Sequence, residues 1–342
     1  MNLKHITFFC LGGSLLLGLF TACSKSGVKP NNADSTKVVV HIKGWQQVAS
    51  LPSPRAYASA FTLNGNGYVA GGISDMGDPH APGYDDMYMY DAIANKWIKK
   101  AGMPALDIAK GGRQYPFTFM INDTIYGGGG VSLNGMPGND VNAYDPVKDQ
   151  WKLVAKLNGI NAFDQSSGVE IKNKGYIFSL ASGHATVYEF EPTSKTVIEA
   201  PFASYFTSYL SGPWAENSWY GTDGTDLLTC YTVVQKIDTV THLFSGYTGE
   251  NQPNLPFQHS ILIKGLYYKG NMYSVYGNAG DLYRFNLVKG TYEPLAFQNL
   301  GVTEGVFAFI ADGKLYVAGG NNGIFTPSTD KVWMIDLDAY PQ

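Results

Sequence analysis

The sequence predicts an all-β fold built from six repeats, and three observations lead to this prediction. The 342 residues include 40 Gly, 23 Tyr and 18 Phe, yet only 15% are charged. Glycine and aromatic residues in these amounts favour short strands joined by tight turns over a helical bundle. Two short patterns of similar residues also recur about every 50 residues, as in repeat architectures. When the copies are aligned, each pattern forms a column.

Residues 1–22 are predicted to be a lipoprotein signal peptide. Lys4 and His5 precede an apolar run over residues 6–20, and Thr21-Ala22-Cys23 follows. A membrane-spanning helix needs about 18 residues or more, so this run is too short to span and suits a secretory signal. Residues 20–23 resemble the bacterial lipobox, which implies cleavage before Cys23 and a lipid on its sulfur. Ordinary signal cleavage, with Cys23 unmodified, is the alternative.

Residues 23–37 are predicted to form a lipidated flexible tether, because the segment after Cys23 is polar and contains Pro and Asn. Cys10 would leave with the signal, so Cys230 would have no disulfide partner. We expect the protein in the bacterial cell envelope, lipid-anchored at the outer membrane and facing the periplasm or the surface. A net charge of −4 argues against a nucleic-acid partner.

The first column is a strand-like segment with a tyrosine, followed in the clearest copies by a glycine pair. Its tyrosines are Tyr68, Tyr126, Tyr176, Tyr220, Tyr273 and Tyr316. The second column is an apolar residue followed by an acid or amide: Tyr90-Asp91, Tyr144-Asp145, Phe190-Glu191, Ile237-Asp238, Phe285-Asn286 and Ile335-Asp336. Six residues after the acid or amide, the first five copies carry a large apolar residue: Trp97, Trp151, Val197, Phe244 and Tyr292.

These columns resemble the kelch repeat, which has a Gly-Gly doublet after a strand, then Tyr-Asp, then Trp. The resemblance implies a six-bladed kelch-type β-propeller with four-stranded blades. Glycine permits close packing at a strand end, Asp suits a turn, and the large apolar residue fills the wedge between blades. We therefore expect all three columns to be structural.

Residues 38–342 are predicted to form a single propeller closed by its own N-terminal strand. The sixth repeat ends six residues after Asp336 without a tryptophan, whereas Trp45 lies unpartnered in an alternating stretch over residues 38–48. We therefore expect this stretch to return as the outer strand of blade 6, which protects the seam from an open edge. A separate N-terminal hairpin is the alternative. The blades span approximately 50–102, 103–157, 158–202, 203–250, 251–298, and 299–342 with 38–49.

The resemblance places the candidate ligand site at the mouth of the central channel. Arg55 and Arg113 stand at one offset, 13 residues before Tyr68 and Tyr126. The residues expected to converge there are Arg55, Tyr57, Arg113, Tyr115, Asp164, Gln165, His259 and Glu304. Kelch arginines at this offset often bond loop carbonyls between blades, so a structural role for Arg55 and Arg113 remains open. His259 and Glu304 suit solvated turns as well as ligand contact.

Metal and cofactor chemistry is not predicted. His80 stands among four aspartates in a loop, but without metal-site spacing. Kelch propellers include galactose oxidase, whose copper site needs a Tyr–Cys crosslink. Here Cys230 adjoins Tyr231 on an expected strand, where neighbouring side chains point to opposite faces. We expect no cofactor and no metal.

Two functions remain open. The first is a non-catalytic binding module for a glycan or an envelope or extracellular protein at the channel mouth, because tyrosines and charged groups suit sugars and peptides alike. The second is an enzyme similar to the sialic acid mutarotases among periplasmic kelch propellers. That resemblance implies an acid/base residue, Glu304 or His259, with Arg113 holding a carboxylate. A purely structural scaffold is a third alternative.

Overall fold

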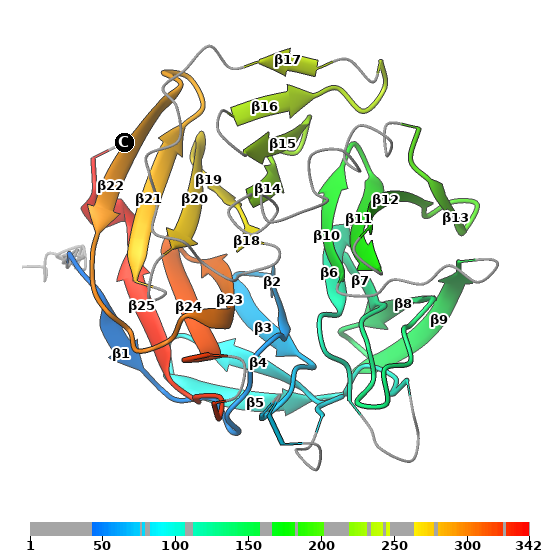
Figure 1. The fold of residues 1–342 in the computed structure, drawn as a ribbon, viewed down its shortest axis with the longest axis horizontal. Coiled ribbons are helices and arrows are strands. Elements are labelled where there is room, and N and C mark those ends of the chain that lie inside the picture. The colour runs from blue at the N-terminus through cyan, green and yellow to red at the C-terminus, as the bar shows by residue number, and fades with distance from the viewer. Residues whose placement is uncertain are drawn as a thin grey trace, which may run out of the picture. The chain divides into compact units, whose positions relative to one another are not determined.

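The computed structural model describes residues 43–75, 77–78, 83–106, 112–157, 166–181, 184–201, 219–230, 234–241, 244–246, 263–276, 280–323 and 326–341. Within the unit formed by residues 41–342, these residues form six sheets in a propeller arrangement, and each sheet contains four antiparallel strands (Figure 1). The predicted fold class is therefore confirmed. The predicted signal peptide and tether lie outside the described residues.

In each blade the first strand named is innermost and the fourth is outermost. Blade 1 comprises β2 (Ser59–Leu63), β3 (Asn66–Ala70), β4 (Met87–Asp91) and β5 (Lys96–Lys100). Blade 2 comprises β6 (Phe117–Ile121), β7 (Thr124–Gly128), β8 (Asp140–Asp145) and β9 (Gln150–Lys156). Blade 3 comprises β10 (Ser166–Ile171), β11 (Lys174–Ala181), β12 (His184–Glu191) and β13 (Thr196–Glu199).

Blade 4 comprises β14 (Trp219–Thr222), β15 (Leu227–Cys230), β16 (Val234–Ile237) and β17 (Phe244–Gly246), and β18 (Ile263–Lys264) pairs in parallel with β14. Blade 5 comprises β19 (Leu266–Tyr268), β20 (Asn271–Tyr276), β21 (Asp281–Asn286) and β22 (Thr291–Ala296). Blade 6 comprises β23 (Glu304–Ala311), β24 (Lys314–Asn321), β25 (Val332–Asp336) and β1 (Gln46–Val48), and the short 3-10 helix η2 (Leu337–Ala339) follows β25.

The N-terminal strand closes the ring, as predicted. β1 pairs with β25, so that Gln46 lies opposite Met334 and Val48 opposite Val332. The two strands lie side by side although they come from opposite ends of the described chain (Figure 1). The described strand begins at Gln46, whereas the sequence suggested residue 38 as its start. Extending the register by one residue places Trp45 opposite Ile335, which is the position of Trp97 opposite Tyr90 in blade 1.

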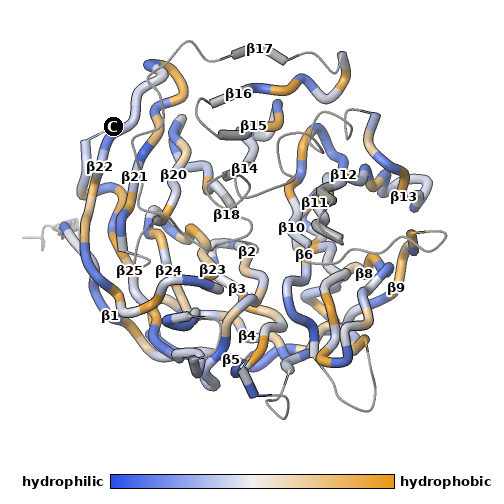
Figure 2. The backbone as a smooth tube through the Cα atoms, viewed as in Figure 1, coloured by the Kyte–Doolittle hydropathy of each residue, from blue (hydrophilic) through white to orange (hydrophobic). Residues whose placement is uncertain are grey.

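Large apolar side chains fill the spaces between blades, as the sixth-residue column predicted. Trp45 is 8% exposed and belongs to a buried cluster that joins blades 5 and 6. Its indole N–H donates to the Gly280 carbonyl, 2.9 Å away. The indole N–H groups of Trp97 and Trp151 donate to the Ala49 and Ala101 carbonyls. Apolar residues occur along the strands of all six sheets (Figure 2).

The turn prediction for the aspartates is confirmed in blades 1 and 2. The Asp91 Oδ1 accepts the backbone N–H groups of Ile93 and Ala94. The Asp145 Oδ1 accepts the equivalent groups of Val147 and Lys148. Each carboxylate replaces the hydrogen bonds that the backbone loses where the chain reverses.

The glycine pair lets neighbouring blades approach closely, also as predicted. Gly71 and Gly72 adopt φ of 73° and 97°, a region that side chains disfavour. The Gly72 N–H donates to the Arg113 carbonyl of blade 2 at 2.6 Å. A Cβ on Gly71 would lie 2.8 Å from that carbonyl oxygen, so only glycine fits the contact. The contact joins the end of β3 in blade 1 to the segment that leads into β6, the innermost strand of blade 2.

Candidate functional site at the channel mouth

Two tyrosines at equivalent positions define the described part of the channel mouth. Tyr57 and Tyr115 each stand 11 residues before their column tyrosine, and both adopt left-handed backbone, with φ of 56° and 52°. Gly305 occupies the same place in blade 6, with φ of 69°. The conformation is ordinary for glycine but costs a bulky residue about 1–3 kcal/mol, and such strain is concentrated at functional sites.

Backbone hydrogen bonds hold these positions in a row across neighbouring blades. The Tyr57 N–H donates to the Gly305 carbonyl, and the Tyr115 N–H donates to the Tyr57 carbonyl, both at 2.8 Å. The Ser166 N–H donates to the Tyr115 carbonyl at 3.0 Å. The row therefore joins blades 6, 1, 2 and 3 and fixes the direction in which each tyrosine leaves the backbone.

The two tyrosine rings pack against each other. Their centroids lie 4.6 Å apart at an interplanar angle of 41°. Tyr57 is buried together with Ala56 and Ile73, and Tyr115 and Leu133 pack against this cluster. A Cβ on Gly305 would lie 3.0 Å from the Tyr57 ring, so the absence of a side chain at this position leaves room for the ring.

Two buried polar side chains complete the described site. Glu304 begins β23 and lies opposite Asn321, the last residue of β24. Glu304 is 4% exposed and Asn321 is 1% exposed. The Tyr57 hydroxyl lies close to both side chains, yet neither amide atom of Asn321 forms a well-aligned hydrogen bond with any other described residue. A buried amide whose hydrogen-bonding groups are not satisfied is costly, about 1–3 kcal/mol, so this side chain is suited to receive a ligand group.

The electrostatics keep the Tyr57 phenol protonated. Burial, with a further contribution from the Glu304 carboxylate, raises the pKa of Tyr57 well above its ordinary value. Within the described residues, Glu304 forms no ion pair. A neutral phenol beside a carboxylate can donate a hydrogen bond to it and can orient it toward a hydroxyl-bearing ligand.

Arg55 lies inside blade 1 rather than at the mouth. Its side chain is fully buried, and it forms a two-pronged ion pair with Asp86, with Nη1 2.6 Å from Oδ1 and Nη2 3.3 Å from Oδ2. Nη1 also donates to the Gly71 carbonyl, and the guanidinium stacks 4.4 Å from the Tyr84 ring centroid. The described contacts hold Arg55 in the frame of the blade.

Arg113 repeats this arrangement in blade 2. The side chain is 1% exposed, and its Nη1 and Nη2 lie 2.9 and 2.7 Å from the Asp140 carboxylate oxygens. Nε donates to the Pro104 carbonyl and Nη1 to the Gly129 carbonyl. We assign both arginines to the frame, because each guanidinium is already bound to a carboxylate and to backbone carbonyls.

The remaining predicted residues cannot be placed. Asp164, Gln165 and His259 lie outside the described residues. Of the predicted set, the structure therefore brings together Tyr57, Tyr115 and Glu304. Asn321 was missed, although one signal existed: Ile73 and Val131 follow the glycine pairs of blades 1 and 2, whereas an amide follows the pair in blade 6.

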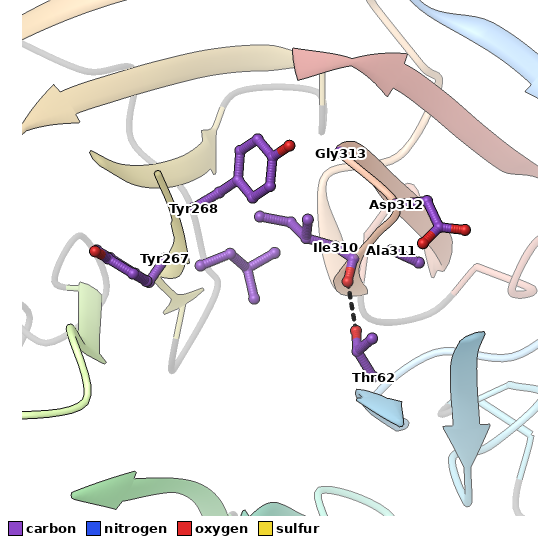
Figure 3. Close-up of a pocket in the computed structure, with 8 residues that line it drawn as sticks. Thr62, Tyr267, Tyr268, Ile310, Ala311, Asp312 and Gly313 are labelled. Carbon is purple, nitrogen blue, oxygen red and sulfur yellow. Dashed lines mark hydrogen bonds between the residues drawn. The ribbon is translucent and has the colours of Figure 1, made fainter. Parts of the chain in front are cut away.

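The opposite end of the channel carries a hollow. A cavity of about 530 Å³ is lined by β19 and by the β23–β24 turn, from Ile310 to Gly313 (Figure 3). Thr62 of blade 1 also lines the cavity, and its hydroxyl donates to the Ile310 carbonyl of blade 6 at 2.6 Å. Four of its residues also line a cavity of about 230 Å³ to which all six blades contribute. Asp312 is the exposed acid here.

Comparisons with known proteins agree with the fold and indicate sugar chemistry among relatives. N-acetylneuraminate epimerase of Shigella sonnei is 27% identical over 185 residues, which cover 53% of this chain and 41% of that protein. The enzyme of the same name from Yersinia enterocolitica is 29% identical and covers 32% of this chain and 36% of its own length. The alignments thus span about two fifths of these relatives.

A solved structure described as that of YjhT matches with a TM-score of 0.57 at 11% identity, covering 83% of this chain and 95% of that one. At this identity the match supports the propeller fold alone. No protein-family model matches the chain. Among the described residues, no helix is long and apolar enough to cross a membrane, and no group of three acidic, His or Cys side chains is placed to hold a metal ion.

Proposed function

We propose that the propeller binds a monosaccharide unit at the channel mouth, through Tyr57, Tyr115, Glu304 and Asn321. The observation that carries this proposal is the buried Asn321 amide, which forms no well-aligned hydrogen bond within the described part of the chain and lies beside a buried carboxylate and a phenol. Sugar hydroxyls both donate and accept hydrogen bonds, so one ring could satisfy all three groups. The two tyrosine rings provide an apolar surface for the sugar's C–H face.

Anomer epimerisation of a bound sugar is the second candidate. The Glu304–Tyr57 pair favours it, because a carboxylate can take the proton of the anomeric hydroxyl while a neighbouring acid protonates the ring oxygen. The similarity to N-acetylneuraminate epimerases points the same way. A sugar acid would need a cation for its carboxylate, and the three described arginines are bound to Asp86, Asp140 and Glu293.

The two candidates differ in one measurement. We would follow exchange between the anomers of N-acetylneuraminate by NMR in the presence of the protein, together with binding by titration. Binding without faster exchange would establish a binding module, and binding with faster exchange an epimerase. Tyr57→Phe should reduce either activity, whereas Tyr267→Phe, at the other end of the channel, should not. Absence of both binding and exchange across neutral and acidic sugars would contradict the proposed site.

We also propose that the protein is a lipoprotein of the bacterial envelope. The support is the sequence before Cys23, with its apolar run and lipobox-like end, followed by a polar tether. A lipid at Cys23 would hold the propeller near a membrane surface. A single acyl chain gives only marginal binding, whereas the diacylglycerol that the lipobox-like sequence implies at Cys23 would supply two chains. Loss of metabolic palmitate labelling in Cys23→Ser tests this anchor.

A further inference from the structure

The strand directions give the propeller two distinct faces. In blade 1, β2 runs away from Tyr57 at the mouth, and each later strand reverses direction, so β4 also runs away from the mouth. The turns that follow the first and third strands of a blade therefore lie on the face opposite the mouth. We call this the hairpin face.

Exposed aliphatic residues stand at the tips of four outer turns on the hairpin face. They are Ile93, Val147, Val240 and Val288, with exposed fractions of 99%, 93%, 69% and 91%. Each stands two residues after the Asp or Asn whose side chain accepts its backbone N–H. Such turns favour polar residues, so the local structure gives no reason for a β-branched side chain in four separate blades.

The two faces differ in how much apolar surface they expose. Among the described residues, the large exposed apolar side chains on the hairpin face include Met120 and Tyr267 at the channel end, 39% and 46% exposed, in addition to the four tips. On the mouth face the corresponding residues are Met136, at 52%, and Phe297, at 63%, which directly follows β22. Tyrosine at the centre and aliphatic residues at the rim suit the boundary between headgroups and acyl chains.

The polypeptide also enters the propeller on the hairpin face. β25 runs toward this face, and β1 is antiparallel to it, so the residues just before β1 lie there. The Gly44 N–H donates to the Tyr340 hydroxyl at 3.1 Å, and the Lys43 Nζ lies 5.4 Å from the Tyr340 ring centroid, just beyond β25 and η2. From Cys23 to Lys43 the chain would reach about 65–70 Å fully extended and average about 25 Å as a coil.

We propose that the hairpin face docks on the lipid bilayer, with Ile93, Val147, Val240 and Val288 inserted at headgroup level and the channel mouth turned away from the membrane. This inference rests on the lipid anchor proposed at Cys23. That anchor would hold the membrane close to the face on which the chain enters the propeller. Lysines stand next to two of the tips: Lys148, which forms an exposed ion pair with Asp145 at 2.9 Å, is beside Val147, and Lys289 is beside Val288. Their ammonium groups can reach the phosphates while the aliphatic side chains insert. The docked geometry leaves the sugar site open to ligands from solution.

The first experiment measures depth on the full-length lipidated protein. It is purified from membranes, reconstituted into phosphatidylethanolamine–phosphatidylglycerol vesicles, and labelled with a polarity-sensitive fluorophore at single cysteines in a Cys230→Ala background. Val147→Cys and Val288→Cys report on the hairpin face, and Met136→Cys is the matched control on the mouth face. We expect blue-shifted emission and quenching by spin-labelled lipid at 147 and 288, consistent with insertion by about 5–10 Å, and neither effect at 136.

Equal, solvent-like signals at all three positions in membrane-bound protein would overturn the docking while leaving the anchor intact. A blue shift at 147 that needs no vesicles would indicate self-association of copies and would also overturn it. Protein that fails to stay on vesicles, with Cys23 itself reacting with the fluorophore, would instead refute the anchor.

The second experiment separates docking from the anchor. In Cys23→Ser protein we would measure partition onto the same vesicles by sedimentation, with and without serine at residues 93, 147, 240 and 288. We expect the fourfold serine variant to lose roughly tenfold or more in partition, because several methyl groups leave the lipid boundary. A control with Met136→Ser should partition like its parent. Equal partition of the parent and the fourfold variant would contradict docking by the tips.

Discussion

Replacing Arg113 by alanine should destabilise the fold and should act on ligand affinity only through the fold. The guanidinium is 1% exposed and makes two hydrogen bonds with the Asp140 carboxylate, which is itself largely buried. Arg113→Ala leaves that carboxylate without its cation. Breaking a buried pair from one side typically costs about 3–5 kcal/mol, a large part of a usual stability of about 5–15 kcal/mol.

The cost should depend on pH in a defined direction. Burial acts to raise the pKa of Asp140, but the hydrogen bonds and charge of Arg113, together with Asn142, outweigh it and hold the pKa below its ordinary value. A carboxyl whose folded pKa is depressed contributes stability that is present above its unfolded pKa, about 4, and is lost as pH falls through the folded pKa. The difference between wild type and Arg113→Ala should therefore be full at pH 7 and shrink in acid.

The assay is urea unfolding of both proteins across this pH range, with sugar titration at pH 7. Arg55→Ala is the internal control, because Arg55 pairs with Asp86 in the same way and should cost a similar amount. Arg113→Ala that unfolds like wild type but loses sugar binding would refute the reasoning and return Arg113 to the ligand site.

The other predictions concern closure, the mouth and the anchor. Deleting residues 24–36 should leave the melting temperature unchanged, whereas deleting through Trp45 should remove a buried indole worth about 3–5 kcal/mol; equal melting of the two truncations would disprove closure. Gly305→Ala should weaken sugar binding by displacing Tyr57 and should cost about 1–3 kcal/mol from its φ of 69°, read by titration and melting, with unchanged affinity as the contrary result. Cys23→Ser should abolish palmitate labelling and release the protein from membranes, and persistent labelling would exclude this anchor.

The blade architecture could be predicted because each structural column has a local cause. Asp91 closes its turn within three residues, and the register that pairs Tyr90 with Trp97 depends only on that turn. The closure of the ring could also be predicted from the sequence, because Trp45 had no assigned blade and the sixth repeat had no outer strand of its own. The first argument depends only on residues close in sequence, and the second matches a missing strand with an unassigned one. The structure confirms both.

The direction of the arginine side chains could not be read in the same way. Their partners, Asp86 and Asp140, lie 31 and 27 residues away, across loops of different length. A weak signal existed, since each of these aspartates stands four residues before the tyrosine of the second column. The left-handed backbone of Tyr57 and Tyr115 had no sequence signal, because glycine appears at that position in blade 6 alone among the described examples.

The most direct test of the sugar site is a calorimetric titration of N-acetylneuraminate into wild type, Glu304→Gln and Glu170→Gln. Glu304 lies at the mouth, whereas Glu170 stands on an inner strand near the opposite end of the channel. Losing a charge-assisted hydrogen bond worth about 1.5–3 kcal/mol should weaken binding by roughly 10- to 150-fold in Glu304→Gln, while Glu170→Gln should bind like wild type. Equal affinities for all three proteins, or a loss confined to Glu170→Gln, would contradict a sugar site at the mouth.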